Sequence, residues 1–275
     1  EYIIDGEYDN IICTHVFPAL ALTEMRKRHD CPQLIMSYVS TDYTCSPSTA
    51  DSSLDWYFIP SPLLADEFSG QGIPEEKLVA SGMPVKEIFY RRIPLEEGKT
   101  ALGIDPTHRH ILMMCGSMGC GPMEDIILYF RSLLSEEQEL SVICGTNEDL
   151  YRRLQRITAQ YPQIHIYGKV DNVPQLMQAS DVFMTKPGGL STSEAMAAGL
   201  PMVLIDAVAG CEAHNLDYFV SNGMAVTEDT PKAIADLTLK LLNEPELLSK
   251  MRAAMPQVSC TAPEAVYSWM RDHKE

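Results

Sequence analysis

The sequence predicts an α/β protein made of two doubly wound units, and three observations support this. Apolar strand-like runs alternate with amphipathic helical runs along nearly the whole chain, which is typical of a parallel sheet with crossover helices. The alternation breaks once, in the polar stretch from Tyr90 to Asp105. The chain has 275 residues, of which 45% are hydrophobic and 21% charged, enough for two units with cores of their own.

The first unit is expected in residues 1–92 and has fewer elements than the second. Its predicted strands are NIICTH, CPQLIMSYVS, DWYFIPS and KLVASGMPV. One helix is predicted from about Pro18 to His29, and another through SPLLADEFSGQG, which ends on Gly72. The chain has no initiator methionine, and EYIIDGEYDN leads directly into a strand. We therefore expect a segment of a longer protein, with this first unit incomplete.

The second unit is expected in residues 93–258 and looks complete. A linker and one helix open it, and six strands follow with helices between them: HILMMCG, LSVICG, IHIYGK, DVFMTK, PMVLID and MAVTE. Two helices are predicted from Thr230 to about Met255, and Pro256 ends the pattern. A last amphipathic helix, from about Pro263 to His273, lies in a segment (259–275) that we expect to pack back on the first unit.

Charge and composition exclude several classes of function. The net charge of −17 argues against a nucleic-acid binder, whose contact face is basic. No apolar run approaches 18 residues, so no membrane span is expected. The eight cysteines lie mostly in strand-like runs and form no C-x-x-C pair, which favours buried free thiols in the reducing cytoplasm. His108 and His110 lack a third ligand, so a metal site there is not expected.

The stretch KPGGLSTSEAMAAGL follows a predicted strand and opens a helix near Ser191. Glycines there allow a phosphate to approach the backbone, and the helix start offers unpaired N–H groups. The hydroxyls of Ser191, Thr192 and Ser193 are suited to cap the helix or to donate to phosphate. Glu194, one turn further on, is suited to accept hydrogen bonds from the two hydroxyls of a ribose. A plain capped helix explains the same residues, and the spacing leaves both interpretations open.

A second glycine loop, CGSMGCGP, places Gly116, Gly119 and Gly121 between a strand and a helix. It differs from the dinucleotide fingerprint, and LSVICG ends without the acidic residue that would hold an adenosine ribose, so NAD is not favoured. In AGCEAHN, Glu212 and Asn215 are three residues apart and share a helix face. They would suit sugar hydroxyls, or they would simply face solvent at a helix start.

Together, KPGGLSTSEAMAAGLPMVL, AGCEAHN and GKVDNVPQLMQASDVFMTK resemble the monogalactosyldiacylglycerol synthase and processive diacylglycerol glucosyltransferase family. The first half is similar to it in IICTHVFPALAL, STDYTCSP and GIPEEKLVASGMPV. The resemblance implies the GT-B architecture, two Rossmann-like doubly wound domains facing a cleft. It also implies a UDP-sugar donor, a diacylglycerol-type lipid acceptor, and a place in the cytoplasm or on the inner face of the cell membrane.

The resemblance assigns donor contacts to the second unit. The ribose carboxylate falls on Glu194 and the diphosphate loop on Gly188, Gly189, Leu190, Ser191 and Thr192. The first glycine loop is Gly116, Ser117, Gly119 and Gly121, and the base lies near Gly168 and Val170. The hexose stretch falls on Cys211, Glu212 and Asn215, where Cys211 replaces the usual glutamine and leaves the sugar open. Ser46 also departs from the family, since many relatives have histidine there.

The resemblance implies inverting transfer, and the general base on the family's N-terminal glycine-rich loop has no counterpart before Glu1. His15 and Asp42 are the remaining candidates for a catalytic role, although His15 would equally suit a helix cap. No Asp-x-Asp pair occurs, so we expect a metal-independent reaction without a cofactor. Two alternatives stay open at this point: a UDP-sugar 2-epimerase and a non-catalytic nucleotide-sugar-binding fragment.

Overall fold

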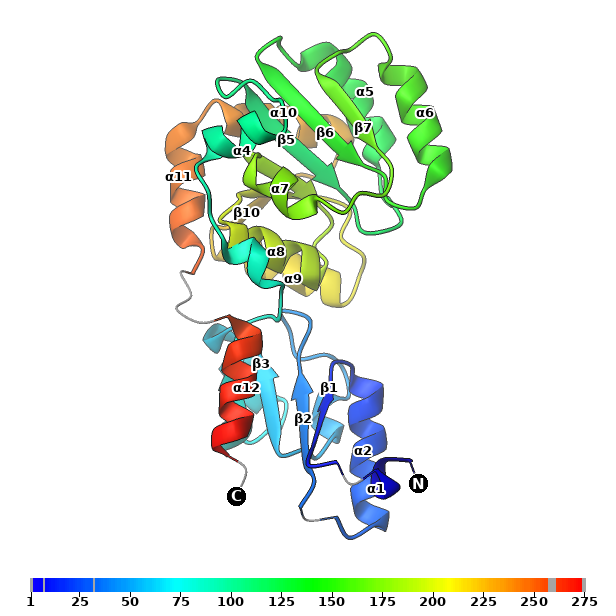
Figure 1. Ribbon diagram of the computed structural model, residues 1–275, viewed down its shortest axis with the longest axis vertical. Helices are drawn as coiled ribbons and strands as arrows, with labels where there is room; N and C mark the ends of the chain where they lie inside the picture. Colours follow the sequence, from blue (N-terminus) through cyan, green and yellow to red (C-terminus); the bar gives the residue numbers. More distant parts are fainter. Residues whose placement is uncertain (1, 7, 32, 257–260, 274–275) are drawn as a thin grey trace. The chain divides into compact units, whose positions relative to one another are not determined.

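The computed structural model describes residues 2–6, 8–31, 33–256 and 261–273. The chain divides into two compact units (Figure 1): unit 1 consists of residues 1–85 and 258–275, and unit 2 of residues 86–257. Each unit holds one sheet, and every strand pair in both sheets is parallel. The α/β class expected from the alternation is therefore confirmed.

Unit 1 has a four-stranded sheet in the order β1-β2-β3-β4. Its strands are β1 (Asn10–Cys13), β2 (Ile35–Val39), β3 (Trp56–Ile59) and β4 (Leu78–Ala80). Its helices are α1 (Tyr2–Asp5), α2 (Val16–Arg28), η1 (Thr49–Asp51), η2 (Pro62–Leu64), α3 (Ala65–Gly70), η3 (Glu75–Lys77) and α12 (Ala262–Asp272). Because the strands run in sequence order and crossovers are right-handed, the connecting helices lie on one face of this sheet.

The other face of this sheet is covered by α12. Val39 of β2 and Phe58 of β3 form a buried cluster with Val266 and Met270 of α12. The helix starts at Thr261, whose backbone N–H donates to Glu264 at 2.9 Å and closes a capping box. The C-terminal helix therefore contributes to the core of unit 1 although 172 residues of unit 2 separate it from β4.

Unit 2 has a six-stranded sheet in the order β10-β9-β8-β5-β6-β7. Its strands are β5 (Arg109–Met114), β6 (Gln138–Ile143), β7 (Ile164–Tyr167), β8 (Val182–Thr185), β9 (Met202–Leu204) and β10 (Ala225–Thr227). Its helices are η4 (Glu87–Tyr90), α4 (Leu95–Ala101), α5 (Met123–Leu133), α6 (Glu148–Thr158), α7 (Val173–Gln178), α8 (Gly189–Ala198), α9 (Cys211–Ser221), α10 (Pro231–Leu242) and α11 (Pro245–Ala254).

The strand order places a topological switch point between β5 and β8. The chain winds outward from β5 through β6 to β7, and then returns to the middle and winds the other way through β8, β9 and β10. In Figure 1, α7 and α8 lie on one face of this sheet, while α5, α6 and α10 lie on the other. The buried cluster on the α5 face includes Ile111, Phe130 and Ile234. Open sheets of this kind bind ligands at the carboxyl ends of the two strands at the switch point.

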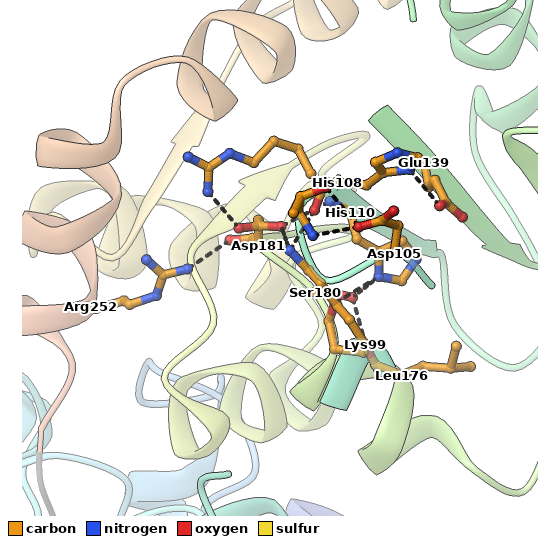
Figure 2. Close-up of polar contacts among 12 residues, drawn as sticks. Lys99, Asp105, His108, His110, Glu139, Leu176, Ser180, Asp181 and Arg252 are labelled. Carbon is orange, nitrogen blue, oxygen red and sulfur yellow. Dashed lines mark hydrogen bonds and ion pairs between the residues drawn. The ribbon is translucent and has the colours of Figure 1, made fainter. Parts of the chain in front are cut away.

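A buried polar network holds the opposite, amino edge of the same sheet (Figure 2). The Asp181 carboxylate, before β8, accepts from Lys99 Nζ at 2.8 Å and from the backbone N–H of His110 at 2.8 Å. His110 lies between the Ala179 carbonyl at 3.0 Å and Ser141 Oγ at 2.9 Å, and it is fully buried. Burial lowers the pKa of His110 to about 4, so the ring is neutral near pH 7. The network ties α4, β5, β6 and β8 together.

Two details of the elements differ from expectation. The helix expected to begin near Ser191 begins two residues earlier, at Gly189, with Gly188 as its N-cap in extended conformation. The chain start expected to lead directly into β1 first forms the single helical turn Tyr2–Asp5.

No helix in the described part of the chain is long and apolar enough to cross a membrane. No disulfide joins the seven cysteines among the described residues, four of which are buried, whereas Cys120 is exposed.

Candidate functional site

The two glycine loops follow the two strands of the switch point. The first, 116–121, leaves β5 and enters α5, and the second, 186–189, leaves β8 and enters α8. Because β5 and β8 are hydrogen-bonded neighbours and run parallel, both loops lie at the same edge of the sheet. Sequence alone could not show this adjacency, since the two loops are about 70 residues apart.

The first loop is packed too tightly for side chains at two of its three glycines, Gly119 and Gly121. Gly116, Gly119 and Gly121 all have positive φ, which favours glycine. A Cβ on Gly119 would lie 2.5 Å from the Cys144 carbonyl oxygen. A Cβ on Gly121 would lie 2.8 Å from an Asp206 carboxylate oxygen. Ser117 is exposed, and its carbonyl accepts from the Thr146 N–H at 2.9 Å. The loop therefore rests on the end of β6 and presents exposed backbone.

The second loop leaves the first turn of α8 open. No side chain of the described residues caps this helix. Thr192 Oγ1 donates to the Gly188 carbonyl at 2.8 Å, and Ser193 Oγ to the Gly189 carbonyl at 2.6 Å. The protons of these two hydroxyls are therefore engaged inside the helix, and of the two roles left open for them, capping of the helix start is not seen. The N–H groups of Gly189, Leu190 and Ser191 precede the first helical hydrogen bond and lie at the positive end of the helix dipole.

Glu194 lies one turn into α8 and is half-buried. Among the described residues its carboxylate has neither a hydrogen-bond donor nor an ion-pair partner. Burial raises its pKa, and the nearby Lys86 ammonium partly opposes this. A half-buried acceptor without an internal donor is costly to the free protein, and a ligand that supplies hydroxyl donors would relieve this cost.

The start of α9 is tied to the second loop. Glu212 Oε2 lies 3.2 Å from Lys186 Nζ and accepts from the Val208 N–H at 3.0 Å. The fully buried Asn215 donates from Nδ2 to the Pro187 carbonyl at 3.0 Å. Glu212 and Asn215 thus share a helix face, as their spacing indicates, and both reach the turn between β8 and α8. Cys211 is the first residue of the same helix and is partly exposed.

Gly168 and Val170 follow β7, at the same edge of the sheet but two strands away from β5. A Cβ on Gly168 would meet nothing within 4 Å, so the backbone there is open. Among the described residues, no group of three or more His, Cys, Asp or Glu side chains is placed to hold a metal ion.

The two candidates in unit 1 follow adjacent strands, His15 after β1 and Asp42 after β2. His15 is the N-cap of α2, and its Nδ1 accepts from the Phe17 N–H at 3.2 Å. This hydrogen bond uses the Nδ1 lone pair and places the proton of the neutral ring on Nε2, so the ring has no free lone pair for a general base. Asp42 is half-buried, and its carbonyl accepts from Ser40 Oγ at 3.0 Å.

Sequence reasoning missed two charged residues beside the glycine loops of unit 2. Asp206 follows β9 with φ of 53°, a left-handed conformation, and its carboxylate lies against Gly121. Lys186 directly follows β8, and its side chain is only 17% exposed in its ion pair with Glu212. The only sequence signal for either was a charged residue at the end of a predicted strand.

Known protein families match most of the chain. The family described as "Monogalactosyldiacylglycerol (MGDG) synthase" matches residues 1–85, and "Glycosyl transferases group 1" matches residues 123–258. Among curated proteins, a processive diacylglycerol beta-glucosyltransferase of Staphylococcus carnosus is 28% identical over 270 residues, covering 98% of this chain and 68% of the relative. The chloroplastic monogalactosyldiacylglycerol synthase of Spinacia oleracea is 30% identical over 280 residues, covering 97% of this chain and 52% of the relative.

The chain is thus related to these glycosyltransferases along nearly its whole length. It spans about two thirds of the length of the bacterial relatives and about half that of the chloroplast relatives. Solved structures support the GT-B architecture. UDP-GlcNAc 2-epimerase of Neisseria meningitidis, solved with UDP-GlcNAc, superimposes with a TM-score of 0.71 at 14% identity, covering 99% of this chain and 78% of that one. MurG of Acinetobacter baumannii gives 0.69 at 16% identity, covering 98% and 75%. At this identity the two likenesses establish the fold only.

Proposed function

We propose that this chain binds a UDP-sugar at the carboxyl edge of the unit 2 sheet. We further propose that it transfers the hexose to a diacylglycerol-type lipid at a membrane surface. The observation that carries the proposal is the pair of glycine loops at the β5/β8 switch point, together with the carboxylate of Glu194 one turn into α8, which has no partner among the described residues. The named activities of the S. carnosus and S. oleracea relatives support the lipid acceptor.

Each part of the donor has a counterpart at this edge. The diphosphate fits the open first turn of α8, where three N–H groups and the helix dipole favour negative charge. The two ribose hydroxyls donate to Glu194. The hexose lies toward Glu212 and Asn215, with Cys211 at the start of the same helix. The uracil lies toward Gly168 and Val170, and the first loop, at Gly116 and its neighbours, closes over the diphosphate.

The reaction is a single displacement with inversion. The acceptor hydroxyl oxygen attacks the anomeric carbon while the bond from that carbon to the diphosphate oxygen breaks, and a general base removes the hydroxyl proton. Negative charge grows on the leaving diphosphate. The N–H groups of Gly189, Leu190 and Ser191 are already oriented toward that position, so they stabilise the charge without reorganisation. Lys186, beside the same turn, adds a positive charge.

Glu194→Gln tests the donor assignment. The carboxylate accepts two charge-assisted hydrogen bonds from ribose, each worth about 1.5–3 kcal/mol. Glutamine keeps the size but is a weaker acceptor and turns an N–H toward the hydroxyls. Calorimetry should show UDP binding at least about tenfold weaker, which corresponds to about 1.4 kcal/mol. Because burial raises the pKa of Glu194, UDP binding by the parent should weaken on acidification at a higher pH than an ordinary carboxylate would give.

Two controls sharpen this test. 2′,3′-Dideoxy-UDP offers no diol, so its affinity should be nearly equal for parent and variant. Glu246→Gln removes an exposed carboxylate from the first turn of α11 and should leave UDP binding unchanged. Equal UDP affinity in Glu194→Gln and the parent would refute the ribose assignment, and equal affinity of the parent for UDP and ADP would refute the uracil assignment.

The product decides between transfer and the alternatives. The chain is incubated with UDP-glucose and diacylglycerol vesicles, and in parallel with UDP-GlcNAc alone, and the products are separated by mass spectrometry and chromatography. A glycosyl diacylglycerol is the expected product. A C2 epimer of the donor without glycolipid would instead identify an epimerase. UDP binding without either product would leave a nucleotide-sugar-binding fragment as the function of this chain.

A further inference from the structure

Lys186 brings a positive charge to the turn between β8 and α8. The residue directly follows β8 and precedes the open first turn of α8. Its Nζ lies 3.2 Å from Glu212 Oε2, and among the described residues no second acceptor contacts this ammonium. An ammonium has three N–H donors. The ion pair with Glu212 therefore leaves part of the hydrogen-bonding capacity of Lys186 for a ligand.

The backbone of this turn is fixed, whereas the Lys186 side chain is flexible. The Lys186 carbonyl accepts from the Gly188 N–H at 2.8 Å. The fully buried Asn215 of α9 donates from Nδ2 to the Pro187 carbonyl at 3.0 Å. The ammonium of Lys186, by contrast, lies at the end of a flexible four-carbon stem. It can therefore change its partner while the turn stays in place.

Negative charge lies close to this ammonium. Glu212 is its ion-pair partner, and Asp206 follows the neighbouring strand β9. The thiol of Cys115, directly after β5, is near both Lys186 and Asp206. Burial raises the pKa of this thiol to about 12, the Asp206 carboxylate raises it as well, and the Lys186 ammonium opposes them. Lys186 therefore lies at the switch point between β5 and β8, with its charge neutralised by Glu212.

A diphosphate at this turn competes with Glu212 for the ammonium. Two anions on one ammonium repel each other, and the repulsion is strong in a site that is partly shielded from water. The side chain of Lys186 is 17% exposed and that of Glu212 29%. A bound diphosphate therefore weakens the ion pair and leaves Glu212 with the Val208 N–H, at 3.0 Å, as its remaining donor among the described residues.

The intact donor and the product differ in what they offer to Glu212. A hexose on the diphosphate has hydroxyl groups that can donate to a carboxylate, and such charge-assisted hydrogen bonds are among the stronger ones in proteins. UDP has no hexose, so it takes the ammonium and supplies no donor in its place. A half-buried carboxylate that loses its cation without gaining new donors is destabilised.

We propose that Lys186 discriminates the UDP-hexose donor from UDP by exchanging its ammonium between Glu212 and the diphosphate. With the donor bound, Lys186 neutralises the diphosphate while the hexose hydroxyls satisfy Glu212. With UDP bound, Glu212 and the diphosphate draw on the same ammonium. The inference rests on the donor site proposed above and adds to it a preference for substrate over product.

The exchange also assists the release of UDP. When the hexose passes to the acceptor, Glu212 loses the hydroxyl donors and recovers the ammonium of Lys186. The diphosphate then shares that positive charge with Glu212, so UDP is held less tightly than the donor was. The release returns the ion pair to the state seen in the free protein.

Four proteins separate this exchange from a purely structural ion pair: the parent, Glu212→Gln, Lys186→Gln and the double variant. Calorimetry measures the affinity of each for UDP, UDP-glucose and UDP-galactose. In Glu212→Gln the glutamine keeps an oxygen for the Val208 N–H but releases the Lys186 ammonium. This variant should therefore bind UDP about fivefold more tightly than the parent. Unchanged UDP affinity would indicate a structural ion pair and overturn the proposal.

The UDP-hexose should not share this gain. Glutamine is a weaker acceptor for the hexose hydroxyls, which offsets the effect of the released ammonium. The preference for the tighter-binding UDP-hexose over UDP should therefore fall about fivefold in Glu212→Gln. Lys186→Gln should weaken UDP binding at least about tenfold, and Lys186→Arg, which keeps the charge, should retain most of the affinity. An equal gain for UDP and the UDP-hexose would overturn the discrimination.

The double variant tests whether Glu212 acts through Lys186. Glu212→Gln should tighten UDP binding at least about threefold more in the presence of Lys186 than in the Lys186→Gln background, because only there does it release an ammonium. Equal tightening in the two backgrounds would show direct repulsion between Glu212 and the diphosphate, and would overturn the exchange.

A matched control removes the same charge elsewhere. Asp236→Asn breaks an exposed ion pair with Lys232 on α10 and should leave all three affinities unchanged, which controls for the change in net charge. If the parent binds none of the three nucleotides, the donor site itself is refuted and the exchange with it. If the parent binds them but the two backgrounds respond equally, the exchange alone is refuted and the donor site stands.

Discussion

Replacing Gly145 by alanine should displace the first glycine loop from the end of β6. It follows β6 with φ of 59°, and a Cβ there would lie 2.1 Å from the Ser117 carbonyl oxygen and 2.7 Å from its carbon. That carbonyl accepts from Thr146 N at 2.9 Å and from Thr146 Oγ1 at 3.2 Å. Gly145→Ala must therefore push the loop away from β6 and break both hydrogen bonds.

The magnitude follows from two contributions. An alanine in the left-handed region costs about 1–2 kcal/mol, and two lost hydrogen bonds cost about 1 kcal/mol each. Gly145→Ala should lower the free energy of unfolding by about 3–4 kcal/mol. Gly103→Ala is the matched control, because Gly103 has φ of 74° and a Cβ there would meet nothing within 4 Å. It should cost only the backbone part, about 1–2 kcal/mol.

The two variants are compared by urea unfolding and by calorimetry with UDP at a temperature where both are folded. Gly145→Ala should bind UDP at least about tenfold more weakly, a loss of about 1.4 kcal/mol, because the displaced loop can no longer close over the diphosphate. Gly103→Ala should bind UDP like the parent. If Gly145→Ala is destabilised as expected but binds UDP with unchanged affinity, the first glycine loop is not part of the donor site.

Two further predictions concern histidines. The pKa of His110 is lowered to about 4 in the folded protein, so below about pH 6.5 the unfolded chain takes up a proton that the folded protein does not. The free energy of unfolding should therefore fall as the pH is lowered from 6.5 to 4, by up to about 1.4 kcal/mol per pH unit. Urea unfolding should show a flatter pH dependence for His110→Gln, and identical slopes would refute the assignment. His15→Asn should keep the stability of unit 1, because asparagine also caps helices, whereas His15→Ala should lose about 1 kcal/mol. Equal losses in these two variants would contradict the capping role.

The strands and helices could be predicted because apolar runs and amphipathic runs follow one another with clear turn residues between them. The order of the strands within each sheet could not be predicted. The sequence does not state that β8 returns to lie beside β5, because strand order depends on packing between segments far apart in the chain. The helix ends show the same limit on a smaller scale. Thr192 and Ser193 look like capping residues, but they donate to carbonyls in their own first turn, which lets α8 begin at Gly189.

The glycines and Glu194 were proposed as site residues from their place at helix starts and from the family resemblance, since the spacing alone fitted a plain capped helix equally well. The contacts that join the loops were not predicted. The Lys186–Glu212 ion pair and the approach of Asp206 to Gly121 depend on how the loops after β8, β9 and β5 meet. His15 shows the opposite case, where a residue type suited to catalysis serves the helix that follows it.

In the sheet of unit 2, the residues that stabilise the fold and the residues of the candidate site lie at opposite ends of the strands. The buried charges around Asp181 and Lys99 hold the amino edge, and the two glycine loops occupy the carboxyl edge. A strand of six residues spans roughly 20 Å, so substitutions at one edge have little mechanical reach to the other. Laboratory evolution of a new sugar preference should therefore tolerate many substitutions at Cys211 and its neighbours without prior stabilisation of the protein. The buried network around Asp181 and Lys99, which stabilises the sheet, lies outside the region being changed.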